Sequence, residues 1–364
     1  MSTEVVNEIL AKLRRHRLVL VAGPPGVGKS RLLAQVRTAF ETSLPVLPAY
    51  QPNDRTEPFP DRTVPVEDSA NWFPSPERVN RKVFITTFHP NYRYRDFVRG
   101  VAPKIGAVEG FMVTSGQLYK AALHASGDDG AALLIIDEIN RGPAVQIFGD
   151  TIVAIEADKR RGQPNAMPFQ ILDDSGELVD FELPPDLYIL AAMNQADTSV
   201  EALDVAFLRR WEQVALDPDE SLLRQHFGLA EGGLEIPDVP QTAIDVYTAA
   251  VGAWAKVNER ISLGRGPEFR IGHGVFALDE DPPDGVDDSI RFVTDSWHRI
   301  RGHIAEVFFG SVTGVAAVLN TGAASNPIKL EEASFGGMPV ARLKGEETAS
   351  LYDLLRAVAT ADAE

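Results

Sequence analysis

GPPGVGKS, residues 23–30, follows the apolar run Leu18–Ala22 and precedes the apolar segment Leu32–Val36. The spacing of two glycines, a lysine and a serine predicts a phosphate loop, in which glycine backbone lets several N–H groups face a phosphate chain at a helix N-terminus. Lys29 is then expected to reach the terminal phosphates, and the Ser30 hydroxyl to bind Mg²⁺. The alternative is a simple glycine turn, which the strand before the loop and the helix after it disfavour.

The composition indicates a globular protein with room for a large core. The 364 residues are 44% hydrophobic and 24% charged, both ordinary values for a globular chain. A formal charge of −17 argues against a broad surface that follows nucleic-acid phosphates, so any contact with nucleic acid should be local or made through a partner. The absence of cysteine excludes a disulfide framework and thiolate metal sites and favours a reducing compartment.

No targeting or membrane segment is recognisable in the sequence. The N-terminus has the pattern of an amphipathic helix and lacks the apolar stretch of a signal peptide. The longest weakly polar run, residues 308–319, is too short to cross a bilayer. We therefore expect a cytoplasmic protein without a membrane partner.

Apolar runs separated by helical patterns predict an α/β fold. A run without alternation is typical of a parallel strand covered on both faces. We expect five such strands in a parallel sheet, in a three-layer αβα core with a smaller helical lid domain. The predicted strands are Leu18–Ala22, Lys82–Phe88, Ala131–Asp137, Leu187–Met193 and Trp211–Leu216.

The domain boundaries follow changes in composition. The nucleotide-binding α/β domain is expected over residues 1–217, with a proline-rich insertion at 41–80 and a β-hairpin at 168–183. A helical lid domain is expected over 218–325, and a hairpin with a final helix over 326–364. Within the first domain, periodicity predicts helices over 143–156 and from about 200 to 210.

Polar residues that suit nucleotide hydrolysis follow the predicted strands, where a parallel sheet collects its ligands. Asp137 suits the Mg²⁺ shell, Glu138 suits the general base, and Asn194 suits orientation of water or of the γ-phosphate. Arg209 and Arg210 end the following helix and suit an arginine finger inserted into a neighbouring copy, which implies a ring. Each has a structural alternative: a helix cap for the acidic pair, a turn for the asparagine, and a solvated helix end for the arginines.

Several segments together carry a family resemblance. These are GPPGVGKS, FHPNYRYRDFVRG, LLIIDEINRG, IFGDTIVAIEADKR, LYILAAMNQADTSVEALDVAFLRRWE, VNERI and FRIGHGVF. They resemble the AAA+ module of the McrB family, GTPase subunits of methylcytosine-dependent restriction systems, over about residues 4–310. The resemblance implies Walker A at Lys29 and Ser30, Walker B at Asp137 and Glu138, sensor 1 at Asn194, and trans-acting arginines at Arg209 and Arg210.

The candidate site residues combine the motif and the resemblance. The nucleotide-binding set is Gly23, Pro24, Pro25, Gly26, Val27, Gly28, Lys29, Ser30 and Arg31, the metal ligands are Ser30 and Asp137, and the catalytic residues are Glu138, Asn194, Arg209 and Arg210. The substrate is ATP or GTP with Mg²⁺.

The resemblance also implies partners. We expect a homo-oligomeric, hexameric ring acting with a separate nuclease or McrC-like subunit. The family's N-terminal target-reading domain has no counterpart ahead of residue 4, so DNA is expected to be contacted through partners. Three alternatives stay open: a MoxR-like ATPase that matures a client protein, a small-molecule phosphotransferase, and a nucleotide-switched scaffold.

Overall fold

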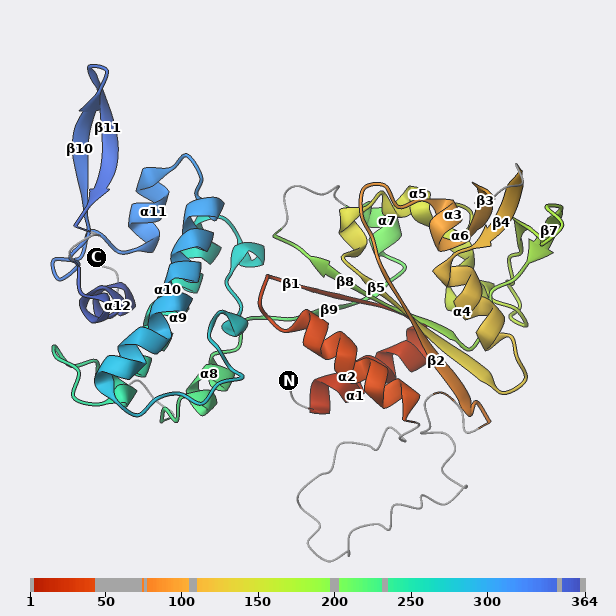
Figure 1. Ribbon diagram of the computed structural model, residues 1–364, viewed down its shortest axis with the longest axis horizontal. Coiled ribbons are helices and arrows are strands. Elements are labelled where there is room, and N and C mark those ends of the chain that lie inside the picture. The colour runs from red at the N-terminus through yellow and green to blue at the C-terminus, as the bar shows by residue number, and fades with distance from the viewer. Residues whose placement is uncertain are drawn as a thin grey trace, which may run out of the picture. The chain divides into compact units, whose positions relative to one another are not determined.

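The structure is a computed structural model that describes residues 3–42, 74, 77–104, 110–196, 203–230, 235–345 and 349–360. The chain forms two compact units (Figure 1). Unit 1 is Met1–Ala22 with Lys29–Ala215, and unit 2 is Gly23–Gly28 with Leu216–Glu364. Most of the insertion expected at 41–80, and the first residues of the helix expected near 200, lie outside the described residues.

Unit 1 is built on a five-stranded parallel sheet, which confirms the predicted fold class. The strand order is β2-β5-β8-β1-β9, so the strand that leads into the phosphate loop lies between β8 and β9. The strands are β1 (Leu18–Gly23), β2 (Asn80–Thr87), β5 (Gly130–Asp137), β8 (Leu187–Asn194) and β9 (Glu212–Ala215). β1, β5 and β8 are buried along almost their whole length, as expected when helices cover both faces of a sheet.

Helices cover both faces of this sheet. Figure 1 shows α1 (Thr3–His16) and α2 (Lys29–Glu41) on one face and α4 (Gln117–Ala125) on the opposite face. Along each buried strand, alternate side chains point to the α4 face and to the α1–α2 face of the sheet. Leu20 lies in the core cluster that includes the α4 side chains, whereas Tyr188 of β8 meets Phe40 of α2 with ring centroids 6.0 Å apart. The α4 layer also contains α5 (Ala144–Phe148), α6 (Thr151–Ala154) and α7 (Val205–Leu208).

The helix predicted over 143–156 is wrong as a single element. The structure has α5 and α6 separated at Gly149, whose φ is 49°. This left-handed backbone ends the first helix, and glycine adopts it without steric cost. A Cβ at Gly149 would also lie 2.7 Å from Cδ2 of Tyr94. The short helix α7 occupies only part of the helix expected from about 200 to 210, and its N-cap Asp204 accepts a hydrogen bond from Ala206 N at 2.9 Å.

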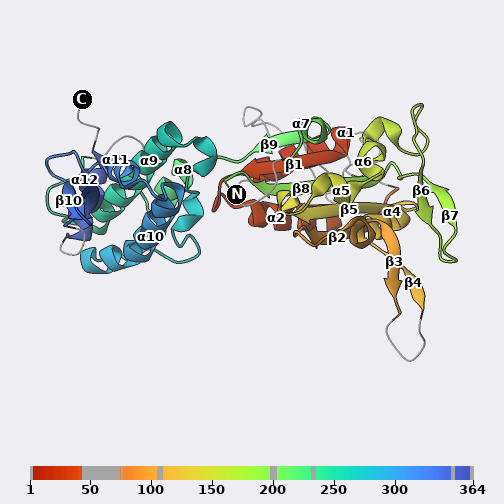
Figure 2. The same cartoon turned by 90° about the horizontal axis from the view of Figure 1, so that it is seen from above.

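Two antiparallel hairpins extend from unit 1. One is β6 (Phe169–Leu172) with β7 (Leu178–Phe181), inside the segment where a hairpin was expected. The other, β3 (Arg99–Pro103) with β4 (Phe111–Ser115), was not predicted, because both strands are short and β3 contains a glycine and ends at a proline. It follows the helical turn α3 (Tyr94–Phe97) and is seen with the first hairpin in Figure 2.

Arg160 is a fully buried cation that joins two segments of unit 1. Its Nε and Nη2 donate to Ile155 O at 3.0 and 2.6 Å, and its Nη1 donates to the carbonyls of Pro184 and Leu187. Burial, together with the nearby positive charge of Arg17, lowers the pKa of Arg160 to about 9. The guanidinium stays protonated at neutral pH and ties the end of α6 to the beginning of β8.

Arg160→Met is expected to destabilise unit 1 by about 3 kcal/mol, because buried carbonyls lose their donor. For a unit of this size the thermal midpoint should fall by about 6–12 °C, which calorimetry can measure. Arg161→Met is the matched control, since the Arg161 side chain is exposed, and it should change the midpoint little. Equal midpoints for the two variants would contradict the anchoring role of Arg160.

Unit 2 is mostly helical. Its core packs α9 (Ala243–Gly264) against α10 (Val286–Val307) around Trp254 and Trp297. The Trp254 indole donates to Ile271 O at 3.0 Å, so this buried aromatic is also satisfied at its polar end. The other elements are α8 (Glu220–His226), the 3₁₀ turns η4 (Pro267–Phe269) and η5 (His273–Val275), α11 (Val312–Val318), the hairpin β10 (Lys329–Phe335) with β11 (Met338–Lys344), and α12 (Leu351–Ala359).

No helix in the described part of either unit combines the length and the apolar character needed to span a membrane.

Candidate nucleotide site

The predicted phosphate loop joins β1 to α2, which begins at Lys29. Gly26 and Gly28 have φ values of 78° and 88°, a conformation that strains residues with a side chain. Val27 between them is buried, whereas its glycine neighbours turn the backbone. The N-terminus of α2 therefore follows a tightly turned loop, the geometry that suits phosphate oxygens.

A glycine-rich segment of unit 2 contacts the backbone of this loop. Gly272 N donates to Pro25 O at 2.9 Å, and Gly274 N donates to Gly26 O at 2.8 Å. His273 between them is buried, and its Nδ1 accepts the Asp219 N–H at 3.1 Å. Burial lowers the pKa of His273, which favours the neutral ring that this hydrogen bond requires. The sequence showed these residues only as part of a family resemblance, because no local pattern indicates which loop they contact.

Gly272→Ala is expected to weaken nucleotide binding by about 10-fold to 100-fold, because the contact leaves no room for a methyl group. A Cβ at Gly272 would lie 2.0 Å from Gly26 C and 2.3 Å from Val27 N, so the phosphate loop backbone would have to move. Titration with a fluorescent nucleotide measures the effect. Gly302→Ala is the control, since a Cβ there meets no atom within 4 Å. Unchanged affinity in Gly272→Ala would show that this contact does not shape the loop.

Lys29 and Ser30 form the first turn of α2, and two carboxylates act on the lysine. Burial lowers the pKa of Lys29, and the negative charges of Glu138 and Asp137 partly offset this effect. The predicted Walker A lysine and the predicted Walker B carboxylates are therefore electrostatically coupled inside unit 1. Ser30 and Arg31 are exposed on the same turn, where a hydroxyl is accessible to a metal ion.

Glu138 has an unusual backbone and an unsatisfied carboxylate oxygen. It follows the end of β5 with φ 52° and ψ 48°, a left-handed conformation that is uncommon for a residue with a side chain. Its Oε2 is buried without a hydrogen-bond partner among the described residues, although Arg141 Nε lies 3.4 Å away. Backbone strain of this kind often marks functional sites, and the open acceptor can take a hydrogen bond from a water molecule.

Asn194 ends β8, and a second asparagine links it to the turn after β5. Asn140 Nδ2 donates to Asn194 O at 2.9 Å, while Asn140 Oδ1 is buried without a hydrogen-bond partner within the described part of the chain. Asn194 Oδ1 accepts a hydrogen bond from Ala196 N at 3.3 Å, which is the turn role considered as the structural alternative. Asn140 was not predicted as a site residue; its position three residues after Asp137 is the signal that could have identified it.

The residues present fit a magnesium ion that is bound mainly by substrate and water. Ser30 and Asp137 offer oxygen ligands, which Mg²⁺ prefers, and Asp137 uses only Oδ1 for the Glu138 N–H at 3.0 Å. No group of three or more His, Cys, Asp or Glu able to hold a metal occurs in the described ranges. Such a donor set matches ions that arrive with a nucleoside triphosphate, since Mg²⁺ there keeps several waters.

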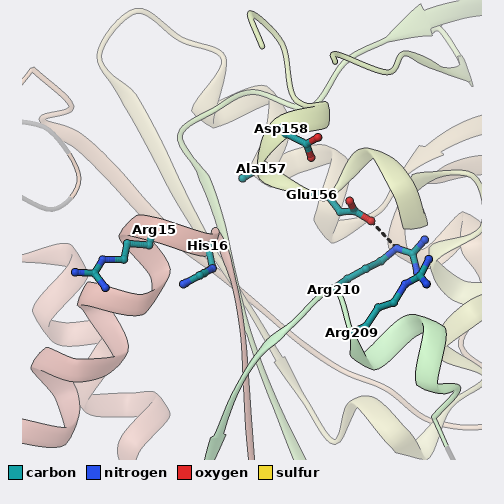
Figure 3. A pocket seen from close by; sticks show the side chains of 7 residues that line it. All are labelled: Arg15, His16, Glu156, Ala157, Asp158, Arg209 and Arg210. Carbon is teal, nitrogen blue, oxygen red and sulfur yellow. Dashed lines mark ion pairs between the residues drawn. The ribbon is translucent and has the colours of Figure 1, made fainter. Parts of the chain in front are cut away.

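Arg209 and Arg210 lie away from these residues in the sequence and line a separate hollow of about 470 Å³ (Figure 3). Arg210 is held from both sides: its Nε lies 2.8 Å from Glu156 Oε1, and its Nη1 donates to Ala206 O. Arg209 is exposed, and its side chain makes no hydrogen bond or ion pair with any residue that the structure describes. The sequence prediction gave the two arginines one role. In the structure the Arg210 side chain is already bound within the chain, whereas the Arg209 side chain can bind another molecule.

The chain matches known proteins in its sequence. The AAA domain family matches residues 12–148. Over 280 residues the chain is 29% identical to the type IV methyl-directed restriction enzyme EcoKMcrB subunit of Escherichia coli (strain K12), covering 74% of this chain and 50% of that protein. Over 87 residues it is 37% identical to the type II restriction enzyme BsuMI component YdiS of Bacillus subtilis (strain 168), covering 22% of this chain and 25% of that protein. The chain thus spans half or less of the length of these relatives.

Solved structures add little beyond this. A protein from Cytophaga hutchinsonii assigned as an ATPase aligns with 98% of this chain and 88% of its own at a TM-score of 0.34 and 12% identity. PCH-2 of C. elegans aligns with 82% of this chain and 68% of its own at a TM-score of 0.33 and 12% identity. TM-scores this low support no conclusion about this chain. The fold assignment depends on the parallel sheet, its phosphate loop and the AAA domain match.

Proposed function

We propose that this chain, a McrB-like AAA+ module, hydrolyses ATP or GTP with Mg²⁺ as the motor subunit of a McrBC-like restriction complex. One observation carries the hydrolysis: Glu138, strained and with an open carboxylate oxygen, lies beside the coupled pair of Asp137 and Lys29. The restriction role is supported by the names of the two relatives, a methyl-directed restriction subunit and a restriction component.

In the proposed mechanism each residue has a separate task. Backbone N–H groups of the phosphate loop bind the β- and γ-phosphates, and Lys29 neutralises their charge. Ser30 and Asp137 would hold Mg²⁺, which when bound supplies a positive charge to the phosphate oxygens. Glu138 Oε2 accepts a proton from the attacking water. Asn194 orients that water or the γ-phosphate, and Asn140 fixes its backbone through the 2.9 Å hydrogen bond to Asn194 O.

The hexameric ring is the remaining part of the proposal. An exposed arginine side chain that has no polar partner in the described structure gains no contact energy to offset the entropy lost when it is ordered. Such a side chain can instead bind the triphosphate of a neighbouring copy. Arg209 meets this description, whereas Arg210 is engaged by Glu156. We therefore assign Arg209 as the trans-acting residue and Arg210 as the residue that positions the end of α7.

Parallel assays of ATP and GTP test the function. The purified chain is expected to hydrolyse at least one of them in the presence of Mg²⁺, and Lys29→Ala should lose both binding and turnover. Adding DNA, then a candidate nuclease subunit, tests the restriction role: stimulation by the subunit supports it. If the wild-type chain binds neither nucleotide at millimolar concentration with Mg²⁺ present, the proposed function is wrong.

A further inference from the structure

The two hairpins of unit 1 lie next to each other. Figure 2 shows β3–β4 and β6–β7 projecting from the same end of the unit 1 sheet, and β3 also contacts β6. The Arg99 side chain is only 3% exposed and pairs with Asp174 in the turn of the second hairpin. Its guanidinium carbon lies 4.2 Å from the centre of the Tyr119 ring on α4. Arg99 thus fixes the hairpins to each other and to the core.

The second hairpin is also attached to α4 directly. The rings of Tyr119 and Phe181 have centroids 5.3 Å apart, and Phe169 packs edge-on against Phe181 at 5.8 Å. These contacts hold the base of β6–β7 in one position. An ordered surface loses little conformational entropy when a partner binds, so it can bind with useful affinity through a small area.

Both hairpins expose large apolar side chains. Those most exposed are Phe111 at 72%, Leu178 at 64%, Met112 at 48%, Val101 at 41% and Val179 at 38%. Apolar side chains gathered on neighbouring projections, away from the core, are typical of surfaces that contact another macromolecule. Their size favours a partner that contributes apolar side chains of its own.

The charge of this surface selects the kind of partner. From Phe169 to Glu182 the chain has five carboxylates and neither lysine nor arginine. Asp173 is used in its own turn, where it accepts the N–H groups of Ser175 and Glu177, and Asp174 is used by Arg99. Among the described residues, the carboxylates of Glu177, Asp180 and Glu182 have no ion-pair partner. On β3–β4 the described cations are the buried Arg99 and the exposed Lys104.

We propose that these hairpins form a docking surface for a polypeptide segment that carries lysine or arginine among apolar residues. Unpaired carboxylates attract such a segment, and the exposed apolar side chains pack against it. The same carboxylates repel phosphates, so nucleic acid is not the partner of this surface. The inference does not depend on nucleotide hydrolysis, and its test needs no nucleotide.

Fluorescence anisotropy with two probes tests the proposal on the full chain. The probes are a fluorescein-labelled peptide of lysine and leucine and a labelled single-stranded DNA oligonucleotide, both at physiological salt. The wild-type chain should bind the peptide and leave the DNA unbound. Phe111→Ser/Leu178→Ser and, separately, Glu177→Lys/Asp180→Lys should each weaken peptide binding by about 10-fold or more. None of these four side chains belongs to the core cluster of unit 1, and thermal unfolding verifies that the variants fold.

Matched controls separate this surface from general attraction to an acidic protein. Phe309→Ser/Leu263→Ser removes two side chains that are 88% and 80% exposed elsewhere. Asp279→Lys/Glu280→Lys makes the same charge change at exposed positions of unit 2. Both controls should bind the peptide within about twofold of the wild type. Equal losses in the hairpin and control variants would overturn the proposal, as would DNA binding that the hairpin substitutions abolish.

Discussion

Glu138→Gln is expected to reduce nucleotide hydrolysis by about 10²–10⁴-fold, the usual contribution of a general base. The substitution keeps the size of the side chain and removes only its ability to take a proton. Because Glu138 Oε2 accepts no hydrogen bond within the described structure, the amide gives up only the 3.4 Å ion pair with Arg141 among the contacts of this oxygen there. Nucleotide affinity should therefore change little, and the measurement is turnover beside a binding titration on the same preparation.

Glu306→Gln is the matched control for this prediction. Glu306 lies exposed on α10 in unit 2, so the same change of a carboxylate to an amide should leave turnover as it is. If Glu138→Gln hydrolyses nucleotide at the wild-type rate, Glu138 is not the base. If it instead loses binding together with turnover, Glu138 acts in ground-state binding.

Arg209→Ala is expected to reduce hydrolysis by about 10³-fold or more, with an unchanged thermal midpoint, because an arginine supplied in trans stabilises the charge of the transition state. The exposed side chain has no polar contact to lose within the described structure. Arg210→Ala should instead lower the thermal midpoint, since it leaves Glu156 without its 2.8 Å partner. Parallel rate and unfolding measurements on the two variants separate the roles that the sequence had assigned to both.

Mixing the variants tests whether the site is shared. Subunits with Lys29→Ala lack a phosphate-binding lysine and subunits with Arg209→Ala lack the proposed finger, so a mixed ring contains some complete sites. Partial recovery of hydrolysis in the mixture is expected. Arg299→Ala, an exposed arginine on α10, serves as the control and should be fully active alone. A mixture no more active than the sum of its components would contradict a shared site.

Much of the candidate site could be proposed from the sequence because its signals are local. The phosphate loop depends on glycine spacing over eight positions, and β5 and β8 end at Asp137 and Asn194 as their apolar runs suggested. The left-handed backbone of Glu138 was not predicted, and neither was the hydrogen bond from Asn140 to Asn194 O, because it depends on how the ends of β5 and β8 approach one another. The broken helix at Gly149 was missed for a related reason, because apolar periodicity continues across a break that Tyr94 and the glycine backbone impose.

The sequence by itself determined the parallel α/β architecture, the phosphate loop and the relationship to McrB, because apolar runs and motif spacing are written into contiguous residues. Only the tertiary structure decided that Arg210 is engaged by Glu156 while Arg209 is not, and that Gly272 contacts Pro25. It also brought together the hairpins that Arg99 joins. These pairs lie far apart along the chain, and their contacts follow from packing, which no local pattern encodes.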